Sequence, residues 1–317
     1  MIFGIWPGVV AADLVSLEPL DCPPEDAGQT LAALRQLQGP AQEFYVRAYR
    51  HFGAGARPRS GTAPAPPRPE VYAGEGRMVD LVACYRSPVP DPEGFAGFVR
   101  QAVRDVAAWG GGKVQVGEEL NVPAPLDGGS PGCFEAVGAG VAAALDERDR
   151  CDVPVLVGVN AAGLPDPAFC SRLASAVGPQ NAARLDYAGL DIFPDVFRPI
   201  AHEKLPSVVK GLLRRFRTVV TEAGLPETVP VHVTETGWPT GGGRTESTQA
   251  QVLATVADAA LASGAGVEAY EWFGLRDGRT AAGWTARFGL LRDDYTPKPA
   301  FAAIQQLIAG QPARPGS

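Results

Sequence analysis

Two short segments of the sequence each run from β-branched residues into a carboxylate and then into a turn. The first, residues 114–121, contains Glu118 and Glu119, and the second, residues 231–240, contains Glu235. A pair of carboxyl groups can hydrolyse a glycosidic bond, because one donates a proton to the leaving oxygen while the other attacks or stabilises the sugar cation. The two segments therefore indicate glycoside hydrolysis, provided that the fold brings the carboxyl groups together.

The composition is that of an ordinary globular protein. The chain has 317 residues, of which 45% are hydrophobic and 20% charged, and its net charge is −7. An acidic chain without a basic stripe is poorly suited to bind nucleic acid or an anionic membrane. No apolar run is long enough to span a bilayer, and no secretion signal precedes the first predicted strand. We therefore expect a cytoplasmic protein, or a secreted one if a leader has been removed.

The cysteines and histidines do not form a metal-binding pattern. Five cysteines are scattered without a CxxC pair, and the three histidines stand far apart. These spacings predict reduced thiols, no metal site and no cofactor. Strand alternation counted back from Glu235 turns His232 outward, where we expect it to pack against helices.

Strand-like and helix-like patterns alternate along the chain, as they do in βα folds. The predicted strands are 2–6, 43–49, 79–85, 113–118, 153–159, 187–193, 229–235 and 267–273. The predicted helices are 25–37, 92–109, 134–148, 166–177, 205–222, 247–263 and 299–308. Eight such units close into a (β/α)8 TIM barrel, and no glycine-rich nucleotide-binding turn supports an open doubly wound sheet.

No helix is predicted after the second strand. Residues 53–77 are rich in proline, glycine and arginine, and prolines at this density exclude a regular helix. A linker between two domains is the competing interpretation, but the segment before it is too short for a βα domain. We interpret residues 53–77 as a loop within a single catalytic domain that covers residues 1–317.

In order and content these segments resemble the clan A retaining glycoside hydrolases, over nearly the whole chain. The segment Gly117-Glu118-Glu119-Leu120-Asn121 matches the end of the clan's fourth strand. The segment Thr234-Glu235-Thr236-Gly237-Trp238-Pro239 is similar to the nucleophile motif of endo-1,3-β-glucanases and their neighbours. The resemblance implies that Glu119 is the acid/base and Glu235 the nucleophile of a two-step, retaining reaction on a β-glycosidic bond.

The resemblance also implies roles for side chains around this pair. Arg47 matches a second-strand arginine that holds the nucleophile ionised, and Trp272 matches an eighth-strand tryptophan that forms a floor beneath the sugar ring. Trp238 or Trp6 could add apolar surface. Glu271 could contact the substrate or pair with an arginine.

Two positions depart from the clan pattern. Glu118 replaces the asparagine that usually binds the sugar 2-hydroxyl. Strand alternation turns Glu118 away from the site, but if it faces inward it adds a third carboxylate and favours a substrate with a cationic group, such as an amino sugar. Strand six offers Asp191 and Phe193 instead of His and Tyr, so we expect the nucleophile to lack a tyrosine partner and Asp191 to meet a sugar hydroxyl.

The sequence thus predicts a retaining glycoside hydrolase, without metal or cofactor, that acts on a small oligosaccharide or a glycosylated metabolite. A transglycosylase would use the same residues and differ only in excluding water. A catalytically inactive carbohydrate-binding barrel is the third interpretation, and it is favoured by the changed residues at strands four and six. Both candidate catalytic residues, Glu119 and Glu235, are nevertheless present.

Overall fold

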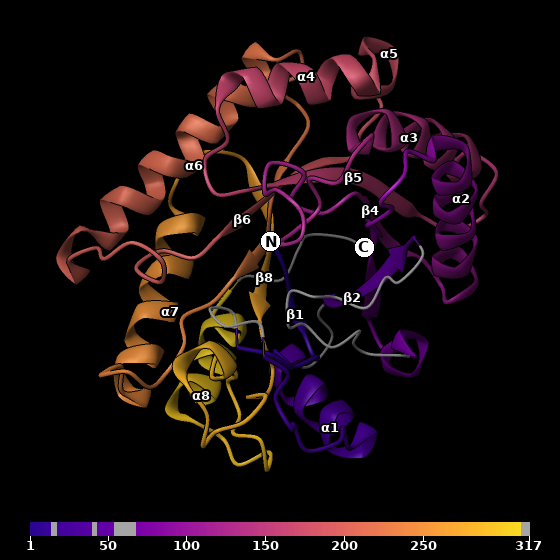
Figure 1. Cartoon of the computed structure of the whole chain (residues 1–317). Helices are drawn as coiled ribbons and strands as arrows, with labels where there is room; N and C mark the ends of the chain where they lie inside the picture. Colours follow the sequence, from indigo (N-terminus) through magenta and orange to yellow (C-terminus); the bar gives the residue numbers. More distant parts are fainter. Residues whose placement is uncertain (14–17, 40–42, 54–67, 312–317) are drawn as a thin grey trace.

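Eight parallel strands form a closed barrel at the centre of the molecule (Figure 1). The computed structural model describes residues 1–13, 18–39, 43–53 and 68–311. Each strand pairs with its neighbours in chain order, and the last strand closes the barrel by pairing in parallel with the first. Helices surround the strands (Figure 1). The predicted (β/α)8 barrel is therefore confirmed.

Every predicted strand and helix is present, with ends that differ by a few residues. The strands are β1 (Ile2–Trp6), β2 (Phe44–Phe52), β3 (Arg77–Tyr85), β4 (Gly112–Val116), β5 (Val155–Ala162), β6 (Tyr187–Ile192), β7 (Val231–Thr236) and β8 (Val267–Phe273). The helices are α1 (Ala27–Gln38), α2 (Pro92–Ala108), α3 (Cys133–Arg148), α4 (Pro167–Val177), α5 (Pro179–Ala182), α6 (Leu205–Glu222), α7 (Glu246–Leu261) and α8 (Pro299–Ala309). The single-turn helix α5 is an addition to the predicted set.

The connection between β2 and β3 contains no α-helix in its described part. Only a 3-10 turn, η1 (Pro69–Tyr72), precedes β3. Residues 54–67, which form the centre of the predicted proline-rich loop, lie outside the described residues. The prediction that a loop replaces the second helix is thus confirmed for residues 68–76.

Local capping explains where α2 and α4 begin. Asp91 and Asp166 each stand immediately before a proline that opens the helix. The Asp91 carboxylate accepts a hydrogen bond from the Gly94 N–H at 2.9 Å, and the Asp166 carboxylate accepts one from the Phe169 N–H at 2.8 Å. Each aspartate satisfies an amide that has no partner within the helix, and each proline supplies a helical φ without needing an N–H.

The barrel interior holds a column of alternating charges, formed by Glu271, Lys113, Asp80 and Arg47. Lys113 of β4 forms ion pairs with Glu271 of β8 and, at 3.3 Å, with Asp80 of β3. Asp80 in turn lies 2.6 Å from Nη1 of Arg47 on β2. None of the four side chains is more than 1% exposed. Because a buried charge is costly unless it is paired, this charged column fixes Arg47 in place beneath the mouth of the barrel.

The thiols and the helices test two further expectations. All five cysteines are free, and Cys84, Cys133 and Cys170 are buried, so no disulfide joins any two of them in this structure. Within the described ranges, no helix combines the length and the apolar character that crossing a membrane requires.

Candidate active site

A cavity of about 780 Å³ opens at the C-terminal ends of the strands. Six carboxylate side chains line it, from the ends of β4, β6 and β7 and from the loops before α3 and α6: Glu118, Glu119, Asp127, Asp191, Asp195 and Glu235. The active sites of (β/α)8 barrels lie at this end, because the loops that follow the strands meet there. The fold therefore brings Glu118, Glu119 and Glu235, predicted from strands four and seven, into one cavity with Asp191.

Glu235 reaches the cavity because β7 is irregular. The register between β6 and β7 shifts after Leu190, so that Asp191 lies opposite Glu235 rather than opposite Thr234. One extra residue on β7 turns both Thr234 and Glu235 inward. The Thr234 hydroxyl accordingly donates a hydrogen bond to Asp191 Oδ1 at 2.6 Å, while Glu235 lines the cavity.

The same shift explains why the prediction for His232 is wrong. The His232 ring is buried and lies parallel to the ring of Tyr187, with the two centroids 4.3 Å apart. The Lys113 ammonium lies 4.9 Å from the centroid of Tyr187, so both rings face the barrel interior rather than the helices. Counting alternate residues back from Glu235 gives the wrong face when a bulge intervenes.

Glu118 and Glu119 both face the cavity because β4 ends early. The strand stops at Val116, and Gly117 follows with φ of 83°, a conformation that costs glycine little. Glu119 also has a positive φ, of 39°. The regular pleat is therefore broken, and the two consecutive glutamates both line the cavity. Of the two orientations that the sequence leaves open for Glu118, the structure has the inward one.

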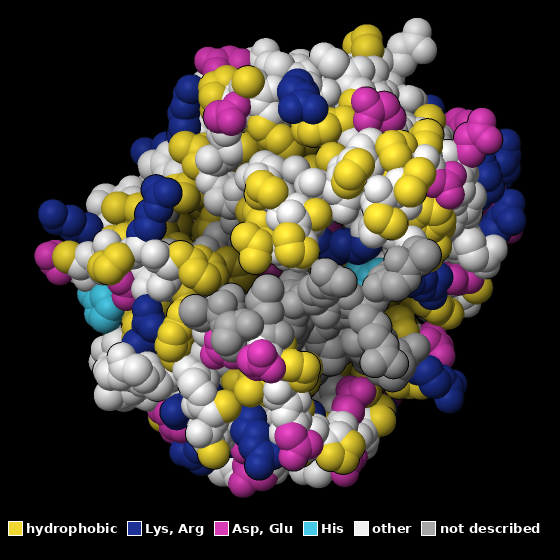
Figure 2. Space-filling model, in the orientation of Figure 1, with side chains coloured by type: hydrophobic (Ala, Val, Ile, Leu, Met, Phe, Trp, Pro, Cys, Tyr) yellow, Lys and Arg dark blue, Asp and Glu magenta, His cyan; other side chains and the backbone are white. Residues whose placement is uncertain are grey.

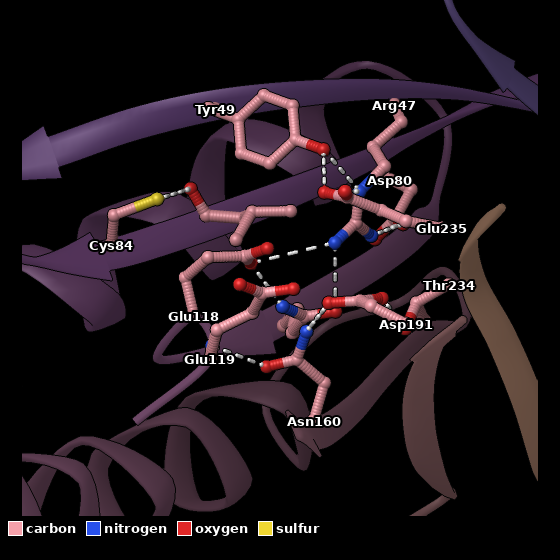
Figure 3. Close-up of polar contacts among 12 residues, drawn as sticks. Arg47, Tyr49, Asp80, Cys84, Glu118, Glu119, Asn160, Asp191, Thr234 and Glu235 are labelled. Atoms are coloured by element: carbon pink, nitrogen blue, oxygen red, sulfur yellow. Dashed lines mark hydrogen bonds and ion pairs between the residues drawn. The ribbon is translucent and has the colours of Figure 1, made fainter. Parts of the chain in front are cut away.

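Arg47 connects the charged column to the cavity carboxylates (Figure 3). Its Nη2 lies 3.4 Å from Oε2 of Glu118, and its Nε lies 3.5 Å from Oε1 of Glu235. The Gln115 side-chain amide also donates a hydrogen bond to Glu118. The predicted contact between Arg47 and Glu235 is present, and the third carboxylate receives positive charge from the same guanidinium.

Glu235 has a tyrosine partner, contrary to the prediction. The Tyr49 hydroxyl donates a hydrogen bond to Oε1 of Glu235 and accepts one from Nε of Arg47 at 2.8 Å (Figure 3). Tyr49 stands two residues after Arg47 on β2, so both side chains point into the barrel. The resemblance places this tyrosine on strand six, whereas the Arg-x-Tyr spacing on strand two is the signal in the sequence that identifies Tyr49.

Asp191 and Asn160 tie the loop after β4 to its neighbouring strands. Asn160 of β5 donates its side-chain amide to Oδ2 of Asp191, and its Oδ1 accepts the backbone N–H of Glu119 at 2.9 Å. Thr234 holds the other Asp191 oxygen. These bonds fix the backbone that carries Glu119 while leaving the carboxyl group of Glu119 directed into the cavity (Figure 3).

Three carboxylates crowd one another in this site. One oxygen from each of Glu118, Asp191 and Glu235 lies within 4.8 Å of the other two. Burial, followed by the negative charge of Glu235, raises the pKa of Asp191 well above its usual value. Oxygen ligands of this kind suit hard cations such as Mg²⁺ or Ca²⁺. Here, however, Arg47 already supplies positive charge to Glu118 and Glu235.

Glu119 and Glu235 lie in contrasting electrostatic surroundings. Among the described residues no lysine or arginine forms an ion pair with Glu119, whereas Glu235 lies beside Arg47. Burial raises the pKa of Glu119 well above its usual value, and the negative charges of Asp127, Asp191 and Glu235 raise it further. The site therefore favours a protonated Glu119 next to a Glu235 whose negative charge is compensated.

Asp127 and Arg86 complete the cavity wall and were not predicted. Their side chains form an ion pair at 2.7 Å, and burial raises the pKa of Asp127 to about 6. Arg86 directly follows β3, and Asp127 lies in the loop between β4 and α3. No strand or helix pattern marks these loop positions in the sequence.

Two of the predicted substrate contacts are buried beneath or beside the cavity. Glu271 belongs to the charged column and pairs with Lys113, not with an arginine. Trp238 is 2% exposed, and its indole N–H donates a hydrogen bond to the Asp195 carboxylate at 3.1 Å. Neither side chain lines the cavity in the described part of the chain, so both serve the structure that supports the site.

The eighth-strand aromatic residue in the cavity is Phe273 rather than Trp272. Because Glu271 faces the barrel interior, alternation turns Trp272 to the outer face, where its ring stacks on Phe3 with centroids 5.4 Å apart. Phe273 lines the cavity and stacks on Trp6 at a centroid distance of 4.5 Å. The resemblance assigns the cavity position to Trp272, one residue before Phe273, and neighbouring residues of a strand point to opposite faces.

At the level of sequence, no protein-family model and no curated protein matches the chain. Solved structures do match it. A fungal β-1,4-galactanase superposes with a TM-score of 0.63 at 12% identity, and the match covers 96% of this chain and 99% of that one.

Two bacterial structures are similar to the same extent. A GH5_18 protein from Streptomyces cattleya in complex with GlcNAc has a TM-score of 0.60 at 16% identity, covering 98% of this chain and 81% of that one. A family 39 glycoside hydrolase from Bacteroides cellulosilyticus WH2 has a TM-score of 0.62 at 16% identity, covering 97% of this chain and 63% of that one. The chain therefore has, over almost its whole length, the (β/α)8 barrel fold of these glycoside hydrolases.

Proposed function

We propose that the protein is a retaining glycoside hydrolase that cleaves a β-glycosidic bond. The observation that carries the proposal is the contrast between two carboxyl groups that line one cavity. Glu235 lies beside Arg47 and accepts a hydrogen bond from Tyr49, whereas the pKa of Glu119 is raised and no cation pairs with it in the described structure. A retaining enzyme needs this combination of an ionised nucleophile and a protonated acid.

The reaction would proceed in two displacements. Glu235 attacks the anomeric carbon to form a glycosyl ester, while Glu119 gives its proton to the oxygen of the leaving group, which departs as an alcohol. Glu119, now a carboxylate, then removes a proton from a water molecule that attacks the anomeric carbon and releases Glu235. Arg47 and Tyr49 stabilise the negative charge of Glu235 before and after each cycle. Two inversions leave the configuration at the anomeric carbon unchanged.

The substrate would be a small oligosaccharide or a glycosylated metabolite. A cationic substituent on the sugar, as in an amino sugar, is a second candidate feature. It is favoured by Glu118, which faces the cavity and lies with Asp191 and Glu235 in a cluster whose oxygens approach within 4.8 Å. A bound ammonium group would relieve the mutual repulsion of these carboxylates.

Turnover of a panel of aryl β-glycosides, glucosaminide included, tests the proposal. We expect release of nitrophenol from at least one sugar, with the β anomer as the first product seen by NMR. Equal rates on glucoside and glucosaminide would exclude the cationic preference, and transfer to an added sugar acceptor in place of hydrolysis would identify a transglycosylase. A folded protein that binds oligosaccharides but turns over none of the panel would instead be a binding barrel.

Replacing Asp127 by Asn should move the alkaline limb of the pH profile of kcat/KM to lower pH. Glu119 must be protonated to act as an acid, so activity falls as pH rises through its pKa. The pKa of Asp127 is about 6, so Asp127 is ionised on the alkaline side of the profile, where its negative charge raises the pKa of Glu119. Removing that charge lowers the pKa of Glu119.

The measurement is the pH–rate profile of the Asp127→Asn variant beside that of the wild type. Asp152→Asn is the matched control, because Asp152 is an exposed aspartate in the loop before β5 and does not line the cavity. An alkaline limb that is unchanged in Asp127→Asn would mean that a group other than Glu119 controls it.

A further inference from the structure

The cavity extends from the catalytic carboxylates along a wall of hydrophobic side chains. This apolar wall is built by loops after β4, β5 and β6 and by the first turns of α6, and consists of Leu126, Leu164, Phe193, Phe197, Val208 and Leu212. Figure 2 shows hydrophobic side chains gathered around the hollow beside α6.

Four members of the apolar wall are unusually exposed for their type. Phe197 is 64% exposed, Leu126 53%, Leu164 46% and Val208 38%. Across the described ranges, the other strongly exposed large hydrophobic side chains are Val71 and Val89, neither of which lines the cavity. Single exposed apolar residues need no explanation, but a group of them around one cavity marks a binding surface.

Two members of the apolar wall, Leu126 and Leu164, lie on the side of the proposed acid, whereas the other four lie between β6 and β7 in the chain. Leu126 belongs to the loop that begins with Glu119, and Leu164 follows β5, whose Asn160 binds the Glu119 backbone. Arg47 and Tyr49, which contact the Glu235 carboxylate, belong by contrast to β2. Because the acid protonates the oxygen that leaves, the departing group must lie on the side of Glu119.

We infer that the apolar wall binds the aglycone, and that the substrate is a β-glycoside of an apolar alcohol or phenol. The inference rests on the proposed function and selects the glycosylated metabolite over the oligosaccharide. A second sugar on the apolar wall would place hydroxyl groups against side chains that offer no hydrogen bond, although Asp195 and Arg198, close to Phe197 in the chain, also line the cavity. An apolar aglycone would instead bury hydrophobic surface on both partners.

The test compares three glycosides of whichever sugar the aryl panel selects: the methyl glycoside, the octyl glycoside below its micelle concentration, and a disaccharide. We expect kcat/KM for the octyl glycoside to exceed that for the methyl glycoside by about tenfold or more, since several methylene groups are removed from water. The disaccharide should resemble the methyl glycoside.

Phe197→Ala should lower the octyl-to-methyl ratio of kcat/KM by about fivefold or more. Phe197 is 64% exposed, so its truncation leaves the core intact. The matched control is Val89→Ala, which removes a side chain that is 67% exposed and lies away from the cavity; the ratio should not change in this variant.

The outcomes separate the inference from the function on which it rests. Hydrolysis that favours the disaccharide, with equal rates on the octyl and methyl glycosides, would overturn the apolar aglycone and leave the glycoside hydrolase standing. An octyl preference that survives in Phe197→Ala but falls in Val89→Ala would place the aglycone elsewhere and overturn the inference. Absence of turnover of every glycoside by the folded protein would overturn both.

Discussion

Replacing Glu235 by Gln is expected to lower kcat by about 10⁴-fold or more on every β-glycoside that the wild type hydrolyses. An amide of nearly the same shape can still accept the Tyr49 hydrogen bond, but it carries no charge to attack the anomeric carbon. The substitution should therefore lower the rate of the chemical step and leave the melting temperature unchanged. Steady-state kinetics on the best aryl glycoside, together with thermal melting of both proteins, measures the two effects separately.

The control for this experiment is Glu222→Gln, which changes an exposed glutamate at the end of α6 and should leave kcat unaltered. A second variant, Glu235→Ala, opens space for a small anion beside the sugar. Added azide should restore turnover in Glu235→Ala and yield a glycosyl azide of inverted configuration, because the anion attacks from the nucleophile's side. A Glu235→Gln protein within tenfold of the wild type would assign the nucleophile to another residue.

Replacing Glu119 by Ala is expected to produce a loss that depends on the leaving group. For alkyl glycosides, whose leaving oxygen requires a proton, kcat/KM should fall about 10²- to 10⁴-fold. For dinitrophenyl glycosides, which depart as stable anions, the first step should be nearly unaffected. A series of aryl glycosides with graded leaving-group acidity measures this dependence, which should be steeper in the variant than in the wild type.

Glu118→Ala is the matched comparison for Glu119. The Glu118 carboxylate accepts hydrogen bonds from Arg47 and Gln115, which distinguishes it from Glu119, although burial raises the pKa of Glu118 well above its usual value as well. Its loss should lower activity on all members of the aryl series by similar factors. If the steep dependence on the leaving group appears in Glu118→Ala and not in Glu119→Ala, the roles of the two neighbours are exchanged.

The fold could be predicted from sequence because it depends on repeated patterns. The strands are largely buried runs of apolar residues, and several helices begin at a recognisable cap, such as the Asp-Pro pairs that open α2 and α4. Errors at the ends of single elements do not alter the order of eight units, and that order specifies the barrel. Helix α5 was not predicted because one turn has no period to detect.

The site was harder to predict because it depends on side-chain direction at irregular points. Alternation holds only while a strand is regular, and it fails at Gly117 and at the register shift of β7. For this reason the face of His232 was assigned wrongly, and the face of Glu118 could not be decided from the sequence. Tyr49 was not predicted, because the resemblance points to the sixth strand for this partner, although alternation from Arg47 places Tyr49 on the same face. Where the backbone stays regular, as on β2, sequence places the side chains correctly.

The charged column has a consequence for how this protein could change over evolutionary time. Removing Lys113 leaves the buried carboxylate of Glu271 without an ion-pair partner in the described part of the chain, at a cost of about 3–5 kcal/mol. Removing Arg47 takes the ion-pair partner from two of the cavity carboxylates. Removing Glu271 or Asp80 takes one ion pair from buried neighbours that keep another. In a marginally stable protein, Lys113 and Arg47 are therefore the members of the column that tolerate a single substitution least. The residues of the apolar wall form no buried ion pairs, so a substitution there leaves no buried charge without its partner. If the proposed function holds, new substrate preferences should arise there first, while the residues that contact Glu235 stay unaltered.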